Sequence, residues 1–559
     1  MLKKKIILLL SLFTAITTHA SDSKTYDQVI QAYAQLAQTY PTLAKLNAEG
    51  KGDNGKPIYT FVIEPSVKKL GKAYVTFLVN NGIHAGEPDG IEASLAFAEE
   101  ILKSPNLYPA VRFVFIPVYN VDGFSTQSCC TRANQDGPEL QGFRANARNL
   151  DLNRDFIKAD ASNTKTFYRI FHQYKPQVFI DTHVSNGADY SYTMTLISSQ
   201  KDKLSEPLRN LLTTVVEPKL YAEMKSVGFP MIPYVNTKAE IPDSGLVGFL
   251  ETPRYSTGYT TLFHCLGFVA ETHMLKPYPQ RVAATKALLK AIADQCQKNT
   301  YAIINAVVES KSAEQAITQF PIQWALNERK STPIVFQGYE AKYKPSEISG
   351  LSRLYYDRSA PYSKKIPFFN QYDAIKQAKK PKAFIIPQAW GEVIERLALN
   401  QVELRPIQSD STIKVNATYI IDFKSPTYPY EGHYLHYGTR TRDTVLEMNF
   451  FKGDYLVYTK SNPVRFLMEV LSPEASDSYF NWNFFDAVVQ QKEHYSDYVF
   501  EDLAVQILKE NPKIKQELDR AKAQDEALRN SARKQLDFIY YRSPYYERSH
   551  RLYPIFKIY

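Results

Sequence analysis

The sequence predicts an α/β protein with a mixed, largely parallel central sheet covered by helices on both faces, followed by a β-rich accessory domain and a helical tail. In its first part, apolar runs typical of buried strands alternate with segments of helical periodicity, which indicates a largely parallel sheet. The chain has 559 residues, too many for one hydrophobic core. Beyond about residue 320 it becomes rich in Pro, Tyr and short strand-like runs. We therefore expect four parts, at residues 1–20, 21–310, 320–470 and 471–559.

The elements of the first large part follow from periodicity. A first helix is expected at residues 26–40, and an apolar run at 73–79 predicts a strand. Pro88 fits the first turn of the helix that follows this strand. Further strands are expected at 111–118, 178–181 and 268–271, and further helices at 204–227 and 281–306. Sites in open α/β sheets lie where strands end and helices begin.

The later parts differ in composition and in the pattern of their apolar residues. Strands are expected at residues 333–340, 383–387, 413–423 and 445–459, with a helix at 390–399. His433 and His436 would face opposite sides of a strand, which favours core or solvated roles over a metal pair. From Ile514 to Leu536 an apolar stripe runs through a charge-rich helix and predicts a face that docks on the protein body. The Tyr-rich end is expected to pack on the surface rather than stack on glycans.

The N-terminal residues predict export. Lys3, Lys4 and Lys5 precede an apolar run at 6–16 and a small-residue stretch, which together predict a signal peptide cut near Ala20. No later stretch approaches about 18 continuous apolar residues, so we expect no stable membrane insertion. The net charge of +9 falls to about +6 on cleavage and is spread along the chain, which does not indicate nucleic-acid binding. A secreted or periplasmic protein is expected.

Three short segments carry residues that suit a metal site. His84 and Glu87 follow the strand at 73–79, where an imidazole and a carboxylate three residues apart can close on one metal ion. His183 ends a second apolar run. Glu271 lies inside a third, whose apolar walls would leave the carboxylate basic.

A fourth segment, residues 143–156, interleaves three arginines and two carboxylates with apolar residues. In this order along the chain, the four segments resemble the zinc carboxypeptidases, the metallocarboxypeptidase family that includes the carboxypeptidase A and B types. The resemblance covers about residues 25–305. The run at 181–190 differs from the digestive enzymes and is similar to a divergent bacterial branch.

The resemblance implies one catalytic zinc ion per chain, held by two histidines and a glutamate. It implies the following roles: His84, Glu87 and His183 as zinc ligands, Glu271 as general base and acid, Arg144 as the group that polarises the scissile carbonyl, Asn153 and Arg154 as the pair that grips the substrate's terminal carboxylate, and Asp151 as the carboxylate that orients the first zinc histidine.

The chemistry requires the same residue types. Three protein ligands leave one zinc position for a water whose pKa falls toward ~7, and a nearby carboxylate must take its proton. A guanidinium pairs bidentately with a carboxylate, and a cation beside the carbonyl oxygen stabilises the oxyanion. Asp151, or in second place Asp181, offers the partner that fixes the tautomer of a zinc-bound imidazole. The sequence holds no HExxH motif, which excludes the helix-borne zincin arrangement.

The loop before Glu271 departs from the family pattern, which places a substrate-binding tyrosine there. Tyr255 is our preferred candidate, and Tyr259 is the alternative. Arg254 also suits substrate binding, although an ion pair with Glu251 is the simpler account.

The four cysteines are too few for a disulfide-built fold. Cys129 and Cys130 are neighbours, so a bond between them would be strained. Cys265 and Cys296 are expected either to pair or to be two buried free thiols.

The sequence thus predicts a secreted zinc metallocarboxypeptidase that acts on peptides or proteins with a free C-terminal carboxylate. Two alternatives remain: a periplasmic zinc peptidase or amidase that acts on cell-wall peptides, and a zinc-bearing binding protein without catalysis. Glu271 and Arg144 argue against the last, because binding alone needs neither a base nor an oxyanion donor.

Overall fold

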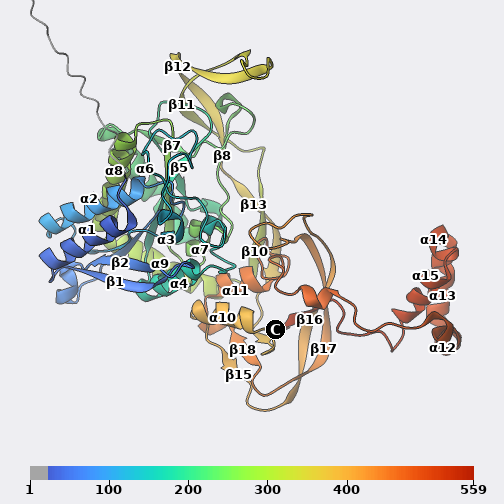
Figure 1. Ribbon diagram of the computed structural model, residues 1–559. Coiled ribbons are helices and arrows are strands. Elements are labelled where there is room, and N and C mark those ends of the chain that lie inside the picture. The colour runs from blue at the N-terminus through green and yellow to red at the C-terminus, as the bar shows by residue number, and fades with distance from the viewer. Residues whose placement is uncertain (1–22) are drawn as a thin grey trace, which may run out of the picture.

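The computed structural model describes residues 23–559, so the expected signal peptide lies outside the described residues. An eight-stranded mixed sheet forms the centre of the first part, in the order β1-β2-β4-β3-β5-β9-β6-β7 (Figure 1). Its strands are β1 (Ala44–Lys51), β2 (Pro57–Ile63), β3 (Val75–Asn81), β4 (Val111–Ile116), β5 (Val178–Ser185), β6 (Met194–Ser198), β7 (Met231–Pro233) and β9 (Leu266–His273). Strands β4, β3, β5 and β9 are parallel neighbours. This arrangement confirms the predicted fold class.

Helices pack around this sheet. They are α1 (Tyr26–Thr39), α2 (Asp89–Lys103), α3 (Val121–Phe124), α4 (Ser162–Tyr174), α5 (Glu206–Leu211), α6 (Glu217–Ser226), α7 (Ser256–Thr261), α8 (Tyr278–Lys298) and α9 (Thr300–Ala316). Helices α2 and α8 pack on each other and on the central strands. The helix expected at 281–306 is in fact two helices, because the chain turns at Asn299 between α8 and α9.

The central strands are apolar because both of their faces are covered. Every residue of β3 and of β5 is buried. Because β3, β5 and β9 are parallel neighbours, their carboxyl ends lie side by side at one edge of the sheet, and the polar residues at these ends meet there.

The second part of the body, which begins at residue 319 and includes the last strand of the chain, is built of smaller sheets. Strands β10 (Gln319–Leu326) and β13 (Tyr372–Lys379) form one pair, and the long hairpin β11 (Thr332–Pro345) with β12 (Ser352–Phe369) joins β8 (Leu246–Val247) in another sheet. A six-stranded sheet has the order β15 (Arg405–Pro406), β18 (Tyr455–Tyr458), β14 (Ala383–Ile386), β19 (Leu552–Ile558), β16 (Ser411–Lys424) and β17 (Tyr437–Phe450).

The two parts share one core. A single cluster of buried apolar side chains includes Phe77 of β3 and Phe384 of β14, together with Trp482. Helix α10 (Gly391–Leu399) packs on α4, and α11 (Val464–Leu471) packs on α9. The β-rich part is thus packed tightly on the first part, where it can influence the site.

The C-terminal helices form a separate arm that projects from the body (Figure 1). They are α12 (Asp497–Glu510), α13 (Pro512–Gln524), α14 (Glu526–Arg529) and α15 (Ala532–Tyr540), and they pack around their own core, which includes Phe500, Leu518 and Leu536. The expected docking of the 514–536 stripe on the body was therefore wrong. Asp525 and Ser531 cap new helices and divide the stripe among three of them.

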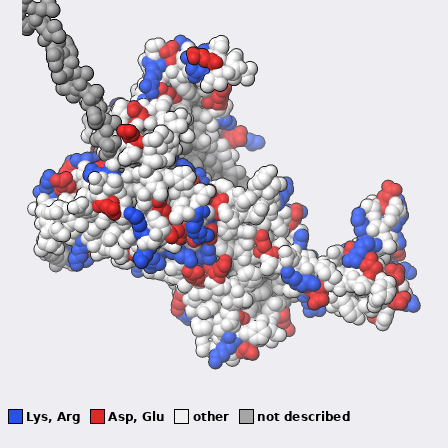
Figure 2. All heavy atoms as spheres, viewed as in Figure 1, with Lys and Arg blue, Asp and Glu red and all other residues white. Residues whose placement is uncertain are grey.

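The chain returns from this arm as strand β19, which enters the six-stranded sheet between β14 and β16. Tyr553 of the Tyr-rich end is fully buried in the core rather than placed on the surface. Within residues 23–559, no helix is both long and apolar enough to span a membrane. Acidic and basic residues are interspersed over the face shown in Figure 2.

The cysteines of the described chain are free. Cys265 and Cys296 are two buried thiols, the second of the two alternatives considered above, and the exposed neighbours Cys129 and Cys130 are not bonded to each other.

Candidate active site

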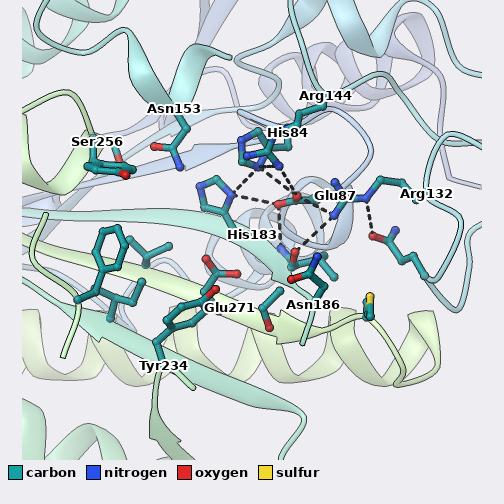
Figure 3. A pocket seen from close by; sticks show the side chains of 18 of the residues that line it. His84, Glu87, Arg132, Arg144, Asn153, His183, Asn186, Tyr234, Ser256 and Glu271 are labelled. Carbon is teal, nitrogen blue, oxygen red and sulfur yellow. Dashed lines mark hydrogen bonds and ion pairs between the residues drawn. The ribbon is translucent and has the colours of Figure 1, made fainter. Parts of the chain in front are cut away.

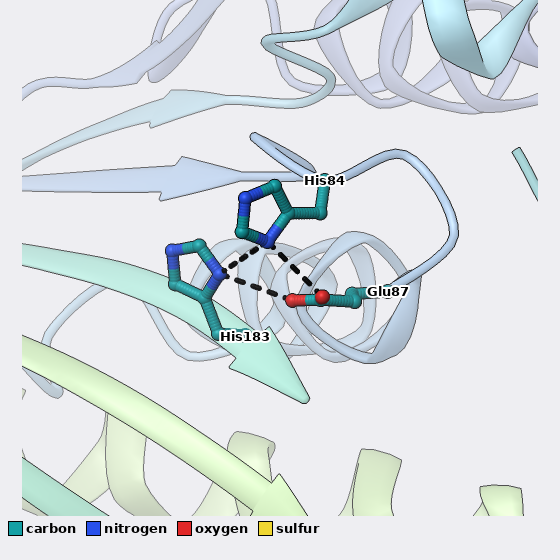
Figure 4. A group of neighbouring side chains, drawn as sticks. All are labelled: His84, Glu87 and His183. Carbon is teal, nitrogen blue, oxygen red and sulfur yellow. Dashed lines mark hydrogen bonds and ion pairs between the residues drawn. The ribbon is translucent and has the colours of Figure 1, made fainter. Parts of the chain in front are cut away.

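Two histidines and a glutamate converge where β3 and β5 end. His84 and Glu87 lie in the turn between β3 and α2, which Gly82 opens with a φ of 67° and which the Glu87 N–H closes by donating to the His84 carbonyl. His183 lies in the second half of β5. All three are buried, and their side chains point toward one another (Figure 4).

The spacing of these three side chains suits a small metal ion. Nδ1 of His84 lies 3.2 Å from Nδ1 of His183, and each of these nitrogens lies 3.0 Å from an oxygen of Glu87. Zinc with ligands at ~2.0–2.1 Å in tetrahedral geometry holds its ligand atoms about 3.3 Å apart. In the described part of the chain, this is the one group of three His, Cys, Asp or Glu side chains close enough to hold a metal.

A carboxylate stands behind each histidine. Nε2 of His84 lies 3.1 Å from Oδ1 of Asp151, and Nε2 of His183 lies 3.1 Å from Oδ2 of Asp181. The hydrogen bond with Asp151 puts the ring proton of His84 on Nε2, and the nearby charge of Asp181 favours the same nitrogen of His183. Both Nδ1 lone pairs can then face the common centre, as metal binding requires. Asp151 and Asp181, which the sequence offered as alternatives, thus lie behind different rings.

Glu271 faces the same cavity from the neighbouring strand. It lies opposite His183 in the parallel pairing of β5 and β9. Burial raises the pKa of its carboxyl to about 7, an effect that nearby Glu87 reinforces and the two histidines oppose. A carboxyl with such a pKa can accept and return a proton near neutral pH.

Arg144 lies at the mouth of the metal-binding group. Its guanidinium donates to Oδ2 of Asp151 through Nε and Nη2, at 3.1 and 2.9 Å. Nη1 lies 3.4 Å from Nδ1 of His84. Arg144 thus presents a fixed positive charge next to the histidines and stays partly exposed to the cavity.

Asn153 and Arg154 follow Asp151 in a short 3₁₀ turn, η2 (Leu152–Arg154), which the Asp151 side chain caps. The Arg154 guanidinium lies 4.6 Å from the ring centroid of Tyr255 and donates to the Asn153 carbonyl at 2.9 Å. Among residues 23–559 no carboxylate forms an ion pair with Arg154. Its charge remains available to a ligand.

The two candidate tyrosines occupy different environments. Tyr255 lines the cavity. Tyr259 lies in the core, stacked on Tyr168, and donates to Oδ1 of Asn400 at 2.6 Å.

A cavity of about 450 Å³ joins these residues (Figure 3). Among the residues that line it are His84, Glu87, Arg144, Asn153, Arg154, His183, Tyr255 and Glu271, while Asp151 lies behind this wall.

Several further residues of the cavity wall do not follow from the sequence, among them Arg132, Tyr234 and Phe249. Arg132 lies 2.8 Å from Oε1 of Glu87. Together with His84 it holds the pKa of this carboxyl well below its usual range, against the opposing effect of burial. The one nearby sequence feature that relates to Arg132 is Gly86, because a Cβ atom at that position would lie 3.0 Å from the Arg132 side chain.

Arg254 does not reach the cavity and does not pair with Glu251. Its guanidinium lies 2.6 Å from Oδ1 of Asp477 in the second part, and its backbone N–H donates to the same carboxylate. Glu251 instead accepts from the backbone N–H of Gln200. Both expectations for Arg254 were therefore wrong.

Comparison with known proteins finds similarity to carboxypeptidases. Residues 29–247 match the family model described as zinc carboxypeptidase. Carboxypeptidase 2 of Trichophyton equinum is 21% identical over 481 residues, which covers 81% of this chain and 83% of that protein. Carboxypeptidase 2 of Trichophyton rubrum is 20% identical with the same coverage. A solved putative carboxypeptidase A from Shewanella denitrificans is 15% identical, covers 49% of this chain and 69% of its own, and has a TM-score of 0.39.

Proposed function

We propose that this chain, whose residues 29–247 match the zinc carboxypeptidase family, is an exported metallopeptidase of that family. It would remove C-terminal residues from peptides or proteins with a free terminal carboxylate. The observation that carries the proposal is the position of Arg154, whose guanidinium has no carboxylate partner among residues 23–559 and lines the same cavity as the metal-binding group. A free carboxylate is the ligand that a fixed guanidinium binds best.

His84, Glu87 and His183 would hold one zinc ion per chain, because their donor set is that of a three-ligand catalytic site. When bound, zinc would act as a Lewis acid and lower the pKa of water at this point. The two carboxylates behind the histidines would keep the rings oriented.

The remaining cavity residues have distinct roles in the proposal. Glu271 would take the proton of the attacking water and deliver it to the nitrogen of the leaving amine, a role that its pKa near 7 supports. Arg144 would stabilise the negative charge that develops on the scissile carbonyl oxygen. Asn153 and Arg154 would bind the terminal carboxylate and fix which bond is cut, with Tyr255 alongside.

The proposed export rests on the N-terminal sequence. Lys3, Lys4 and Lys5 precede an apolar run that ends in small residues near Ala20. N-terminal sequencing of the protein recovered from the periplasm or medium should begin near Ser21. A mature protein in the cytosol that begins at Met1 would contradict this part of the proposal.

Digestion of a defined peptide library tests the activity. We expect single residues to be released from free C-termini, the activity to be lost to a chelator, and added zinc to restore it. Purified cell-wall muropeptides provide the second substrate set. Cleavage of muropeptides without cleavage of ordinary peptides would replace our proposal with the cell-wall alternative.

A further inference from the structure

A tight turn in the second part reaches the active-site loop of the first. Residues Tyr430 to His433 lie within the connection between β16 and β17, and the two end residues exchange backbone hydrogen bonds of 2.7 and 3.0 Å. The two central residues, Glu431 and Gly432, have φ values of 51° and 80°. Positive φ at both central positions defines a type I′ turn, which favours Gly, Asn or Asp. A glutamate at the first central position is therefore strained.

The strained residue contacts the site directly. Oε2 of Glu431 accepts a hydrogen bond of 2.7 Å from the backbone N–H of Asp151. Asp151 in turn caps the turn that carries Asn153 and Arg154. Its carboxylate also contacts His84 and Arg144. The Glu431 carboxylate thus holds Asp151 in place. Four predicted site residues contact Asp151 or lie on the turn that it caps: His84, Arg144, Asn153 and Arg154.

The turn itself is anchored on both sides. His433 lies 2.7 Å from Oδ2 of Asp160 through Nε2 and 2.5 Å from Oδ1 of Asn483 through Nδ1. The ring of Tyr430 stacks on Trp482. These contacts fix the turn against the first part, so the surroundings maintain the strained conformation.

We propose that Glu431 is a positioning residue of the active site, through which the β-rich part holds the Asp151 turn and thereby aligns Arg144, Asn153 and Arg154 with the substrate. A turn that only joined β16 to β17 would be more stable with glycine at this position. The inference rests on the proposed function and extends the site to a region beyond the family match at residues 29–247.

The experiment uses Glu431→Gly, which removes both the strain and the acceptor. We expect its kcat/KM on a peptide with a free C-terminus to fall about 5- to 30-fold, which corresponds to roughly 1–2 kcal/mol, because the loss of one positioning contact misaligns the site without removing a group that touches the substrate. Its melting temperature should be equal to or above that of the wild type, and its zinc content should be unchanged. Glu431→Gln keeps an acceptor oxygen and should restore most of the activity.

Gln401→Gly is the matched control, because Gln401 is also a left-handed residue of the second part, with a φ of 56°, and its side chain is exposed. It should leave kcat/KM unchanged. Wild-type kinetics in Glu431→Gly, or a loss of activity that accompanies a lower melting temperature, would overturn the inference. Equal cleavage of free and amidated peptides by the wild type would instead count against the proposed function, and a selective loss in Glu431→Gly would still support the positioning role.

Discussion

Asp151 and His84 meet across the wall of the cavity, with Oδ1 of the carboxylate 3.1 Å from Nε2 of the imidazole. The opposite ring nitrogen faces Glu87 and His183, so this contact decides which nitrogen is free to bind a metal. The carboxylate also holds Arg144. One side chain thus orients a predicted zinc ligand and a predicted oxyanion donor together.

Replacement of Asp151 should therefore weaken metal binding. We expect Asp151→Asn to lower the zinc affinity by roughly 10- to 100-fold, as is usual when the partner of a ligating histidine is lost. Competition against a chromogenic chelator measures the affinity. Asp27→Asn is the control, because Asp27 is exposed on α1. An unchanged zinc affinity in Asp151→Asn would show that the contact does not tune the site.

Glu271→Gln tests the base. It keeps the shape of the side chain but cannot accept a proton, so kcat should fall by roughly 10²- to 10⁴-fold. Zinc content should stay at the wild-type level, since Glu271 lies outside the group of three ligands. Glu309→Gln, at an exposed position of α9, should behave as wild type. If Glu271→Gln lost its metal, the residue would have to be assigned as a ligand.

Substitution of Tyr255 should affect activity, whereas substitution of Tyr259 should affect stability. Tyr255→Phe should reduce kcat/KM and leave the melting temperature unchanged, because Tyr255 lines the cavity and its hydroxyl makes no hydrogen bond within the core of residues 23–559. Tyr259→Phe removes a buried hydroxyl that bonds Asn400 and should cost roughly 1–3 kcal/mol of stability, with little effect on activity. The reverse pattern would make Tyr259 the functional residue. Steady-state kinetics and thermal unfolding of the two variants decide.

His172 should make the fold sensitive to acid. Burial lowers the pKa of its imidazole from 6.5 to about 4. Because the folded state holds the neutral ring, this group contributes its full stability above about pH 6.5 and loses it as the pH falls toward 4. The full contribution to the free energy of unfolding is on the order of 3 kcal/mol. His172→Gln should therefore show a smaller loss of stability between pH 7.5 and 4.5 in denaturant titrations than the wild type. An identical loss in both proteins would refute the assignment.

Local sequence patterns were enough to predict most of the residues that meet at the cavity. His84 and Glu87 are three residues apart, and the strands that present His183 and Glu271 are recognisable from their apolar runs, so the parallel sheet brings them together. Contacts from the second part could not be foreseen. Glu431 bonds to Asp151 across 280 residues, and nothing in either local sequence specifies that pairing.

The prediction for the C-terminal arm was wrong for a related reason. An apolar stripe fixes the face of a helix but not the surface that covers it. Leu518 and Leu536 pack within the arm, and the caps at Asp525 and Ser531 break the stripe into three helices that turn back on one another.

A double cycle on enzyme and substrate shows whether Arg154 pairs with the terminal carboxylate. The measurement is kcat/KM for wild type and Arg154→Ala, each with the same peptide bearing a free or an amidated C-terminus. A charge-assisted pair contributes roughly 1.5–3 kcal/mol, so amidation should cost the wild type about 10- to 150-fold. In Arg154→Ala the penalty should nearly vanish, because the two changes remove the same contact. Equal cleavage of both peptides by the wild-type enzyme would contradict the carboxypeptidase assignment.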